Sequence, residues 1–233
     1  MKFITTNELS SFLGISIDSN IQAIADGAEE YVLSKIHYVP VNSITETFEG
    51  PASQVNLSQT YIASIEAMLL NNEPVTPAYN LMTGEIYITL SGGDQFSVTY
   101  YPTLEVVEEI TTTTRYALLK GYPIKYIKQV TSNSSVISDY SLMGGMVLKL
   151  PKEGIYTVTY RIGDKLPNDI KMALLVLIKY WYRNYKDSSY GIESYKIGDV
   201  SVKFTSYNTI PFEVDKILEK YSLHYLSWFG GLV

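Results

Sequence analysis

The stretch from Ile162 to Asp187, IGDKLPNDIKMALLVLIKYWYRNYKD, decides how the rest of the chain is interpreted. Pro167 or Asn168 supplies a helix start, and Asp169 follows in the first turn, where a carboxylate interacts favourably with the helix dipole. From Ile170 to Tyr182 the side chains are apolar almost all round. Two lysines interrupt the run, which is shorter than the roughly 18 apolar residues of a membrane span. We therefore expect a central helix covered by other elements or by neighbouring subunits.

Other segments show helical patterns. Residues 5–37 predict two helices: Thr6 or Asn7 can cap the first, and Asp18 or Ser19 opens the second. Ile210-Pro211 begins a last helix. Residues 194–205 predict a short strand or hairpin before that helix.

The region between the helices repeats itself. Tyr79–Leu90 resembles Tyr140–Leu150, with a shared Leu-Met pair and a glycine turn, and Gln95–Tyr100 resembles Ile155–Tyr160, with a shared Val-Thr-Tyr. Both alignments have an offset of about 60 residues, and alternating apolar residues between Gly and Pro turns indicate β-strands. A true duplication explains the match, although β-meanders can also resemble one another without common origin.

The predicted fold class is α+β: a small helical bundle around a central apolar helix, with an inserted, internally repeated antiparallel β region. Residues 1–42 and 162–233 would form the helical core domain. Residues 43–161 would form the β insertion, made of two similar units at about 44–102 and 108–161.

Composition limits the possible functions. The chain has no cysteine, which excludes disulfides and thiolate metal sites and fits an intracellular place of folding. Residues 1–110 hold two basic and 14 acidic residues, whereas residues 111–233 hold 16 basic and 10 acidic ones. Opposite charge on the two halves permits head-to-tail association of like subunits, although an ordinary solvated surface could carry the same asymmetry. The acidic half argues against ordinary nucleic-acid binding.

The sequence contains no catalytic motif that we would defend. The two histidines, His37 and His224, stand alone, and the glycine pairs lie in predicted hairpins and not between a strand and a helix. We therefore predict no catalytic residues, no metal site, no cofactor and no membrane span.

The last residues are unusually apolar for a chain end. Residues 223–233 include Tyr225, Leu226, Trp228 and Phe229. Chain ends are usually polar and loose, so these four side chains are our candidates for a partner-binding arm. Alternatively, they belong to the protein's own core.

Several stretches resemble the head–tail connector (adaptor) proteins of tailed bacteriophages. They are the opening helix at Ile4–Ile15, the strand–turn–strand at Leu118–Val130, the strand-to-helix passage at Tyr156–Leu177 with its Tyr182-Arg183-Asn184 end, and Ile210-Pro211. The resemblance covers residues 1–40 and about 110–222. The first β unit departs from the family's single insertion and looks like an added copy.

The resemblance implies a virion structural protein in the phage neck at the capsid vertex. Such proteins form a homo-oligomeric ring, usually of twelve subunits, that binds the portal protein and presents a platform to the next neck or tail protein. The ring extends the channel for double-stranded DNA, without sequence-specific binding. The alternatives are another neck or tail protein (a stopper or tail-completion protein), a Tyr-rich β adhesion or glycan-binding module, or an enzyme without a recognisable motif.

Overall fold

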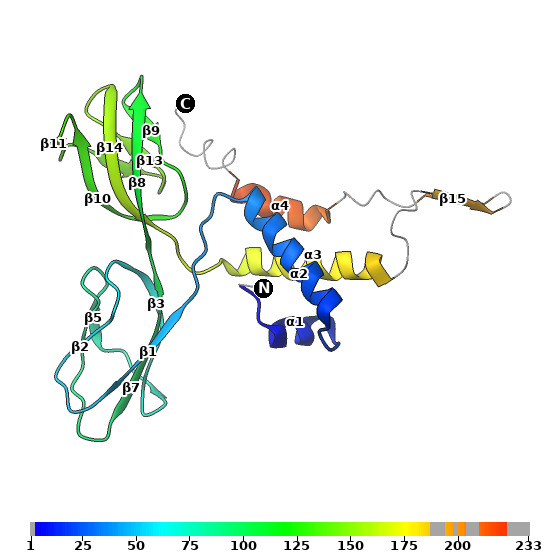
Figure 1. The fold of residues 1–233 in the computed structure, drawn as a ribbon, viewed down its shortest axis with the longest axis horizontal. Helices are drawn as coiled ribbons and strands as arrows, with labels where there is room; N and C mark the ends of the chain where they lie inside the picture. The colour runs from blue at the N-terminus through cyan, green and yellow to red at the C-terminus, as the bar shows by residue number, and fades with distance from the viewer. Residues whose placement is uncertain (1–2, 187–193, 198–199, 204–209, 223–233) are drawn as a thin grey trace. The chain divides into compact units, whose positions relative to one another are not determined.

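We analysed a computed structural model, which describes residues 3–186, 194–197, 200–203 and 210–222. The chain divides into two compact units. Among the described residues, the helical unit comprises those up to Ile36 and those from Pro167 to Ser222, and the β unit comprises His37–Leu166 (Figure 1). The β unit is therefore inserted between the second and third helices.

The described residues of the helical unit form four α-helices: α1 (Thr6–Leu13), α2 (Ser19–Lys35), α3 (Asn168–Lys186) and α4 (Phe212–Lys220). Strands β15 (Ser194–Ile197) and β16 (Val200–Lys203) pair antiparallel between α3 and α4. Capping interactions set the ends of these helices.

The predicted helix start signals are confirmed in part. Asp18 caps α2 by accepting hydrogen bonds from two backbone N–H groups of its first turn. Thr5, not the predicted Thr6 or Asn7, caps α1 through a reciprocal capping box with Glu8. Gly14 ends α1 in the left-handed conformation, at a φ of 72°.

The predicted fold class is wrong. Among the described residues, those in strands outnumber those in helices, and the strands form antiparallel sheets, so this is not a helical bundle around a central helix. Helix α3 contacts the other three helices, but it is not buried all round, because Met172 is 49% exposed. Many of the strands have two or three residues, which is too short for a period-two signal. The sequence pattern therefore overstated the share of the fold that is helical.

The β unit contains two lobes. The first lobe, residues 44–102, has a four-stranded sheet in the order β1-β7-β3-β4 and a small sheet in the order β2-β6-β5. The strands of the large sheet are β1 (Ile44–Glu49), β3 (Ile62–Leu70), β4 (Glu73–Pro74) and β7 (Gln95–Pro102), and those of the small sheet are β2 (Val55–Asn56), β5 (Ala78–Asn80) and β6 (Glu85–Tyr87).

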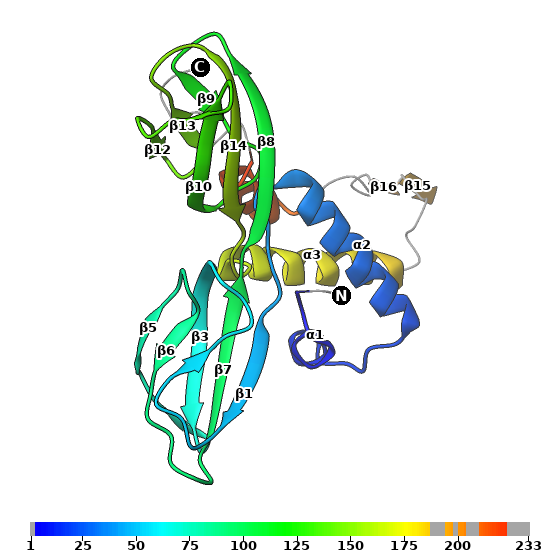
Figure 2. The same cartoon turned by 60° about the vertical axis from the view of Figure 1, so that its left-hand side comes forward.

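The second lobe, residues 104–162, has the same strand order. Its four-stranded sheet runs β8-β14-β10-β11, and its small sheet runs β9-β13-β12 (Figure 2). The large-sheet strands are β8 (Leu104–Thr112), β10 (Ile124–Ser132), β11 (Ser135–Val136) and β14 (Gly154–Ile162); the small-sheet strands are β9 (Tyr116–Leu118), β12 (Ser141–Met143) and β13 (Val147–Lys149).

Irregularities recur at matching positions in the two lobes. The pairing of β3 with β7 shifts register between Ile62 and Ser64, and the pairing of β10 with β14 shifts between Ile124 and Tyr126, which is 62 residues later. The hairpin turns that follow β3 and β10 each place two non-glycine residues at positive φ: Asn71 and Asn72 in one, Asn133 and Ser134 in the other. Two-residue turns of this kind match the twist of the strands that they connect.

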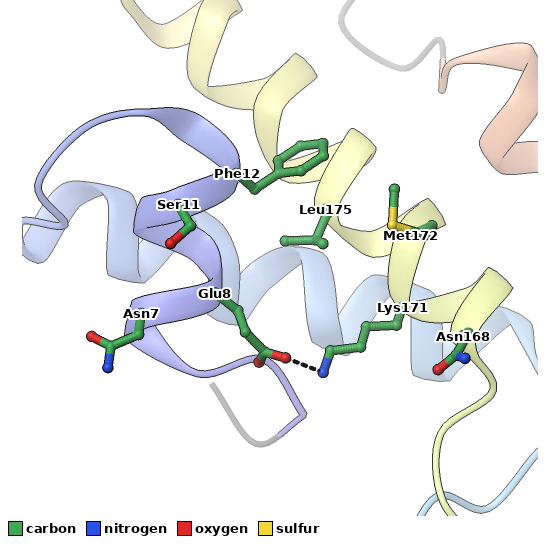
Figure 3. Close-up of a pocket in the computed structure, with 8 residues that line it drawn as sticks. All are labelled: Asn7, Glu8, Ser11, Phe12, Asn168, Lys171, Met172 and Leu175. Carbon is green, nitrogen blue, oxygen red and sulfur yellow. Dashed lines mark hydrogen bonds and ion pairs between the residues drawn. The ribbon is translucent and has the colours of Figure 1, made fainter.

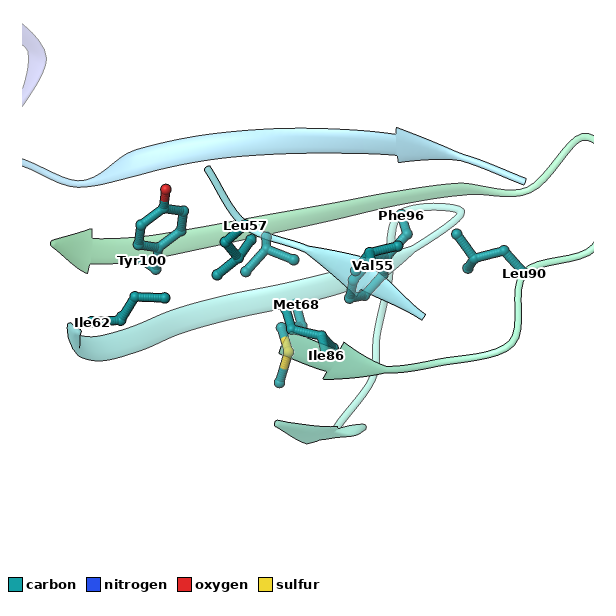
Figure 4. Close-up of a cluster of buried hydrophobic side chains, with 9 residues drawn as sticks. Val55, Leu57, Ile62, Met68, Ile86, Leu90, Phe96 and Tyr100 are labelled. Atoms are coloured by element: carbon teal, nitrogen blue, oxygen red, sulfur yellow. The ribbon is translucent and has the colours of Figure 1, made fainter. Parts of the chain in front are cut away.

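Each lobe encloses its own core. In the first lobe nine buried side chains pack together, shown in Figure 4: Val55, Leu57, Ile62, Met68, Ile86, Leu90, Phe96, Val98 and Tyr100. Each has a buried apolar counterpart 60 or 62 residues later: Ala117, Leu119, Ile124, Val130, Leu148, Leu150, Tyr156, Val158 and Tyr160. Complete burial of one such large side chain stabilises a fold by about 1.5–3 kcal/mol, so each lobe has a substantial core.

The chain enters the β unit alongside the second lobe. The Val39 N–H donates to the Tyr122 carbonyl at 2.7 Å, and the Val41 N–H donates to the Asp164 carbonyl at 3.0 Å. Gly163, at a φ of 101°, makes this close approach possible, because a Cβ there would lie 2.9 Å from the Val41 side chain. Within the described residues, no helix is long and apolar enough to cross a membrane.

Candidate assembly surfaces

The predicted arm residues Tyr225, Leu226, Trp228 and Phe229 lie outside the residues that the structure describes, as does His224. His37 lies in the entry segment, where its carbonyl accepts a hydrogen bond from the Tyr122 N–H at 3.0 Å. The described parts of the chain contain no group of three or more His, Asp or Glu side chains that could hold a metal ion.

In each lobe the hydroxyl of one buried tyrosine contacts a glutamate side chain. In the first lobe the Tyr100 hydroxyl donates to the Glu46 carboxylate, which also accepts the Ser58 N–H at 3.1 Å and the Ser58 hydroxyl at 2.7 Å. Burial of Tyr100, together with its hydrogen bond to Glu46, raises its pKa to about 12. A tyrosine with so high a pKa stays protonated and holds a sheet together, and it is a poor candidate for acid–base chemistry.

The same arrangement recurs in the second lobe. The Tyr160 hydroxyl lies 2.8 Å from Glu108 Oε2 and 2.6 Å from the Lys120 carbonyl oxygen, and the Lys120 N–H donates to Glu108 at 3.1 Å. Burial, and then the hydrogen bond to Glu108, raise the pKa of Tyr160. Sequence reasoning missed both pairs, although a Glu that recurs 62 residues later, beside a recurring Val-Thr-Tyr, was a signal for them.

A polar junction joins the two lobes. The Tyr61 ring lies 5.6 Å from the Tyr126 ring in an edge-to-face arrangement, and the Arg161 guanidinium lies 5.0 Å from the Tyr61 centroid. The Asp164 carboxylate accepts hydrogen bonds from Lys125 of the second lobe and, at 2.8 Å, from Ser64 of the first. Burial acts to raise the pKa of Asp164, but these hydrogen bonds outweigh it and hold the pKa below its ordinary value. These contacts hold the first lobe against the second.

In the helical unit a shallow groove of about 820 Å³ lies between α1 and α3. Phe12, Met172 and Leu175 provide its apolar lining, and an ion pair between Glu8 and Lys171 borders it (Figure 3). Ser11 also lines the groove, but among the described residues its hydroxyl forms no hydrogen bond with Glu8 or another base. The groove can bury apolar side chains of another protein segment.

The small sheet of the first lobe has an apolar and aromatic outer surface. Met82 and Tyr87 are about half exposed, at 52% and 50%, whereas Tyr79, at 48%, pairs with the buried Ile86 and lies on the opposite face of this sheet. The Tyr87 hydroxyl donates to Glu85 at 2.9 Å, and Glu85 also accepts from the Thr83 hydroxyl at 2.9 Å. Exposed large apolar side chains gathered on one small element are typical of interaction surfaces.

The small sheet of the second lobe is basic at the equivalent place. Lys149 of β13 pairs with Ser141 of β12 and Tyr116 of β9, just as Tyr87 of β6 pairs with Ala78 of β5. Arg115 lies beside β9, where its Nε donates to the Leu150 carbonyl at 3.3 Å. Neither Arg115 nor Lys149 forms an ion pair with any residue that the structure describes.

The two lobes differ in charge along their whole length. The first lobe contains six acidic residues (Glu46, Glu49, Glu66, Glu73, Glu85 and Asp94) and no Lys or Arg. The second contains seven basic residues (Arg115, Lys120, Lys125, Lys128, Lys149, Lys152 and Arg161) and five acidic ones (Glu105, Glu108, Glu109, Asp139 and Glu153). The first lobe therefore has a net charge of −6 (0 − 6) and the second a net charge of +2 (7 − 5), so the two lobes of one chain are opposite in sign.

A comparison with protein families gives one match, which bears on function. No curated protein matches the chain. The model of the head completion protein family matches residues 95–223, which is more than half of the chain and includes the last strand of the first lobe, the whole second lobe, α3 and α4. The predicted resemblance to phage head–tail connectors is confirmed by this match. The chain belongs to the head completion protein family and is a structural protein of the phage neck.

Proposed function

We propose that this protein forms a homo-oligomeric ring, of twelve copies, that joins the portal to the tail and extends the DNA channel. The observation that carries this proposal is the family match over residues 95–223. Complementary charge on the two lobes supports it, because a closed ring needs two different surfaces on each subunit. Its work is structural, with no cofactor and no catalysis.

Electron microscopy of the purified protein, alone and mixed with the portal protein of the same phage, tests the ring. Closed rings, or rings formed on the portal, support the proposal. A protein that stays monomeric and ignores the portal contradicts it. A protein that binds only a preassembled portal–adaptor complex is instead a stopper or tail-completion protein, because only the adaptor touches the portal.

A DNA channel requires that DNA slides past the ring, so the protein should not bind DNA tightly. The acidic first lobe meets this requirement, because its carboxylates repel the DNA phosphates. In a filter-binding assay at physiological salt, we expect no retention of double-stranded DNA. Tight, sequence-dependent retention would contradict this part of the proposal.

We further propose that residues 223–233 act as an arm that binds the portal, with Tyr225, Leu226, Trp228 and Phe229 as its anchors. Large apolar side chains gathered in one short stretch favour docking on a partner. Deletion of residues 223–233 should leave the far-ultraviolet circular dichroism spectrum unchanged and abolish portal binding in a pull-down assay. If the deletion unfolds the helical unit, these residues are core and not an arm.

The duplicated architecture also supports a proposal on origin. Matching strand order, register shifts, turns and buried tyrosine–glutamate pairs in the two lobes support duplication of one ancestral unit. Independent β-meanders would not be expected to share an irregularity at the same offset. The first lobe is then the added copy, since most of it lies outside the family match.

A further inference from the structure

We propose that the small sheet of the first lobe binds the small sheet of the second lobe in a second copy of this chain. This inference rests on the proposed ring and names its subunit contact. The first-lobe surface consists of Met82, Glu85 and Tyr87, and the second-lobe surface consists of Arg115, Met143 and Lys149. We call them the aromatic face and the basic face.

The first support is positional equivalence. Ile86 and Leu148 are both fully buried and occupy the same place in their lobes, so the next residues, Tyr87 and Lys149, also correspond. At this position the first lobe has an exposed aromatic residue, Tyr87, where the second lobe has a cation, Lys149. Core positions kept their character while this surface position changed, as expected when the surfaces took up different roles in one contact.

The second support is chemical complementarity. Lysine and arginine bind the faces of tyrosine rings through cation–π interactions. Glu85 lies beside Tyr87, which accordingly presents a ring next to a carboxylate, and both groups attract a cation. Met82 and Met143 are exposed and add flexible apolar contact area.

The third support identifies the occupant. The first lobe has no Lys or Arg with which to balance its six carboxylates. The second lobe of the same chain carries two cations, Arg115 and Lys149, that form no ion pair with any carboxylate that the structure describes. A second copy therefore supplies the complementary charge, and the contact leaves one free face at each end of a dimer. Repetition of such a heterologous contact gives a ring when the rotation closes.

Cysteine crosslinking tests the contact, and the chain is suited to it because it has no cysteine of its own. Three single variants are needed: Ala78→Cys, Ser141→Cys and, as a control, Val107→Cys. Ala78 pairs with Tyr87 and Ser141 pairs with Lys149, and both are exposed, so the cysteines lie beside the contact and leave its side chains in place. Val107 is 63% exposed and lies on the large sheet of the second lobe, away from both small sheets. Each pair of variants is mixed and treated with a short bismaleimide, both as purified protein and within assembled particles.

The mixture of Ala78→Cys and Ser141→Cys should give crosslinked dimers, and a chain that carries both substitutions should give a ladder of multimers. The mixture of Ala78→Cys and Val107→Cys should give neither. If rings form but only the Val107 mixture crosslinks, the inference is wrong and the ring survives. If neither rings nor crosslinks form in either preparation, the inference and the proposed function both fail.

A second measurement separates loss of contact from loss of folding. Tyr87→Ser removes the aromatic face and Lys149→Glu reverses the basic face, while each variant keeps the other face intact. Each alone should be monomeric by mass photometry, with an unchanged circular dichroism spectrum. Their equimolar mixture should form dimers and stop there, because only one productive contact remains per pair. Larger assemblies, or no dimer, would overturn the inference.

Discussion

The two lobes of the β unit share their internal structure and differ in their outer surfaces. Both have a four-stranded sheet and a three-stranded sheet in the same order, the same register shifts, and a buried tyrosine beside a glutamate. Outside, the first lobe is acidic and aromatic, whereas the second is rich in lysine and arginine.

This difference shows which features the fold constrains. Close packing penalises changes of volume in a core, and a buried carboxylate needs its partners, so these features are alike in both lobes. Exposed side chains tolerate exchange at little cost in stability, so the surface is where two copies can become different. The divergent surface is therefore the place to look for interactions.

The largest expected effect tests the equivalence of the two cores. Ile86→Ala and Leu148→Ala each remove a fully buried side chain from the small sheet, and each should lower the free energy of unfolding by about 2–5 kcal/mol. Urea denaturation measures both. The exposed Val107→Ala is the control, with an expected change within about 0.5 kcal/mol. A large loss of stability for only one of the two core substitutions would show that the two cores are not equivalent.

The next effect concerns the tyrosine–glutamate pairs. Tyr160→Phe leaves a deeply buried Glu108, whose side chain is 7% exposed, with one partner fewer, and should cost about 2–3 kcal/mol. Tyr100→Phe should cost less, about 1–2 kcal/mol, because the Ser58 hydroxyl still binds Glu46. Urea denaturation of the two variants checks the order. An equal or greater loss at Tyr100 would show that the first-lobe pair is the stronger one.

The same tyrosines predict a dependence on alkaline pH. The pKa of Tyr100 is raised to about 12 by burial and then by Glu46, and that of Tyr160 is raised too, so the folded state keeps protons that the unfolded state loses near pH 10. Their contribution is complete below pH 10 and declines as the pH rises toward 12. Urea midpoints from pH 8 upward should fall less in a chain carrying Tyr100→Phe and Tyr160→Phe. Parallel curves for both chains would refute this explanation.

The smallest effect lies in the hairpin turns. Asn71 accepts the Gln95 N–H at 2.9 Å and donates to Asp94 at 2.9 Å, whereas no side-chain hydrogen bond of Asn133 is found among the described residues. Glycine suits the positive φ of both positions. Asn71→Gly should therefore lose about 1 kcal/mol, and Asn133→Gly should stay within about 0.5 kcal/mol of the parent. Thermal unfolding measures both, and a loss at Asn133 would reveal a contact that the turns share.

The sequence located many elements and misjudged their proportions. The recurring Val-Thr-Tyr predicted two similar β units, and Asp18, Pro167 and Ile210-Pro211 predicted helix starts within one or two residues. The fold class was wrong because the small sheets are built from strands of two or three residues, which give no periodicity. The aromatic face was missed because only the folded lobe shows which side of β6 is covered: Ile86 is fully buried, whereas the next residue, Tyr87, is half exposed.

The sequence by itself determined the neck-protein family, the helix starts and the repetition of a β unit, because these depend on local residue order. Only the tertiary structure decided which carboxylates are buried, which strands form each sheet, and which side of each lobe is free. Glu46 and Glu108 resemble the other surface acids of the sequence until the sheets place a tyrosine hydroxyl and a backbone N–H against each. Burial and hydrogen bonding are properties of the folded chain, because they arise between residues far apart in sequence.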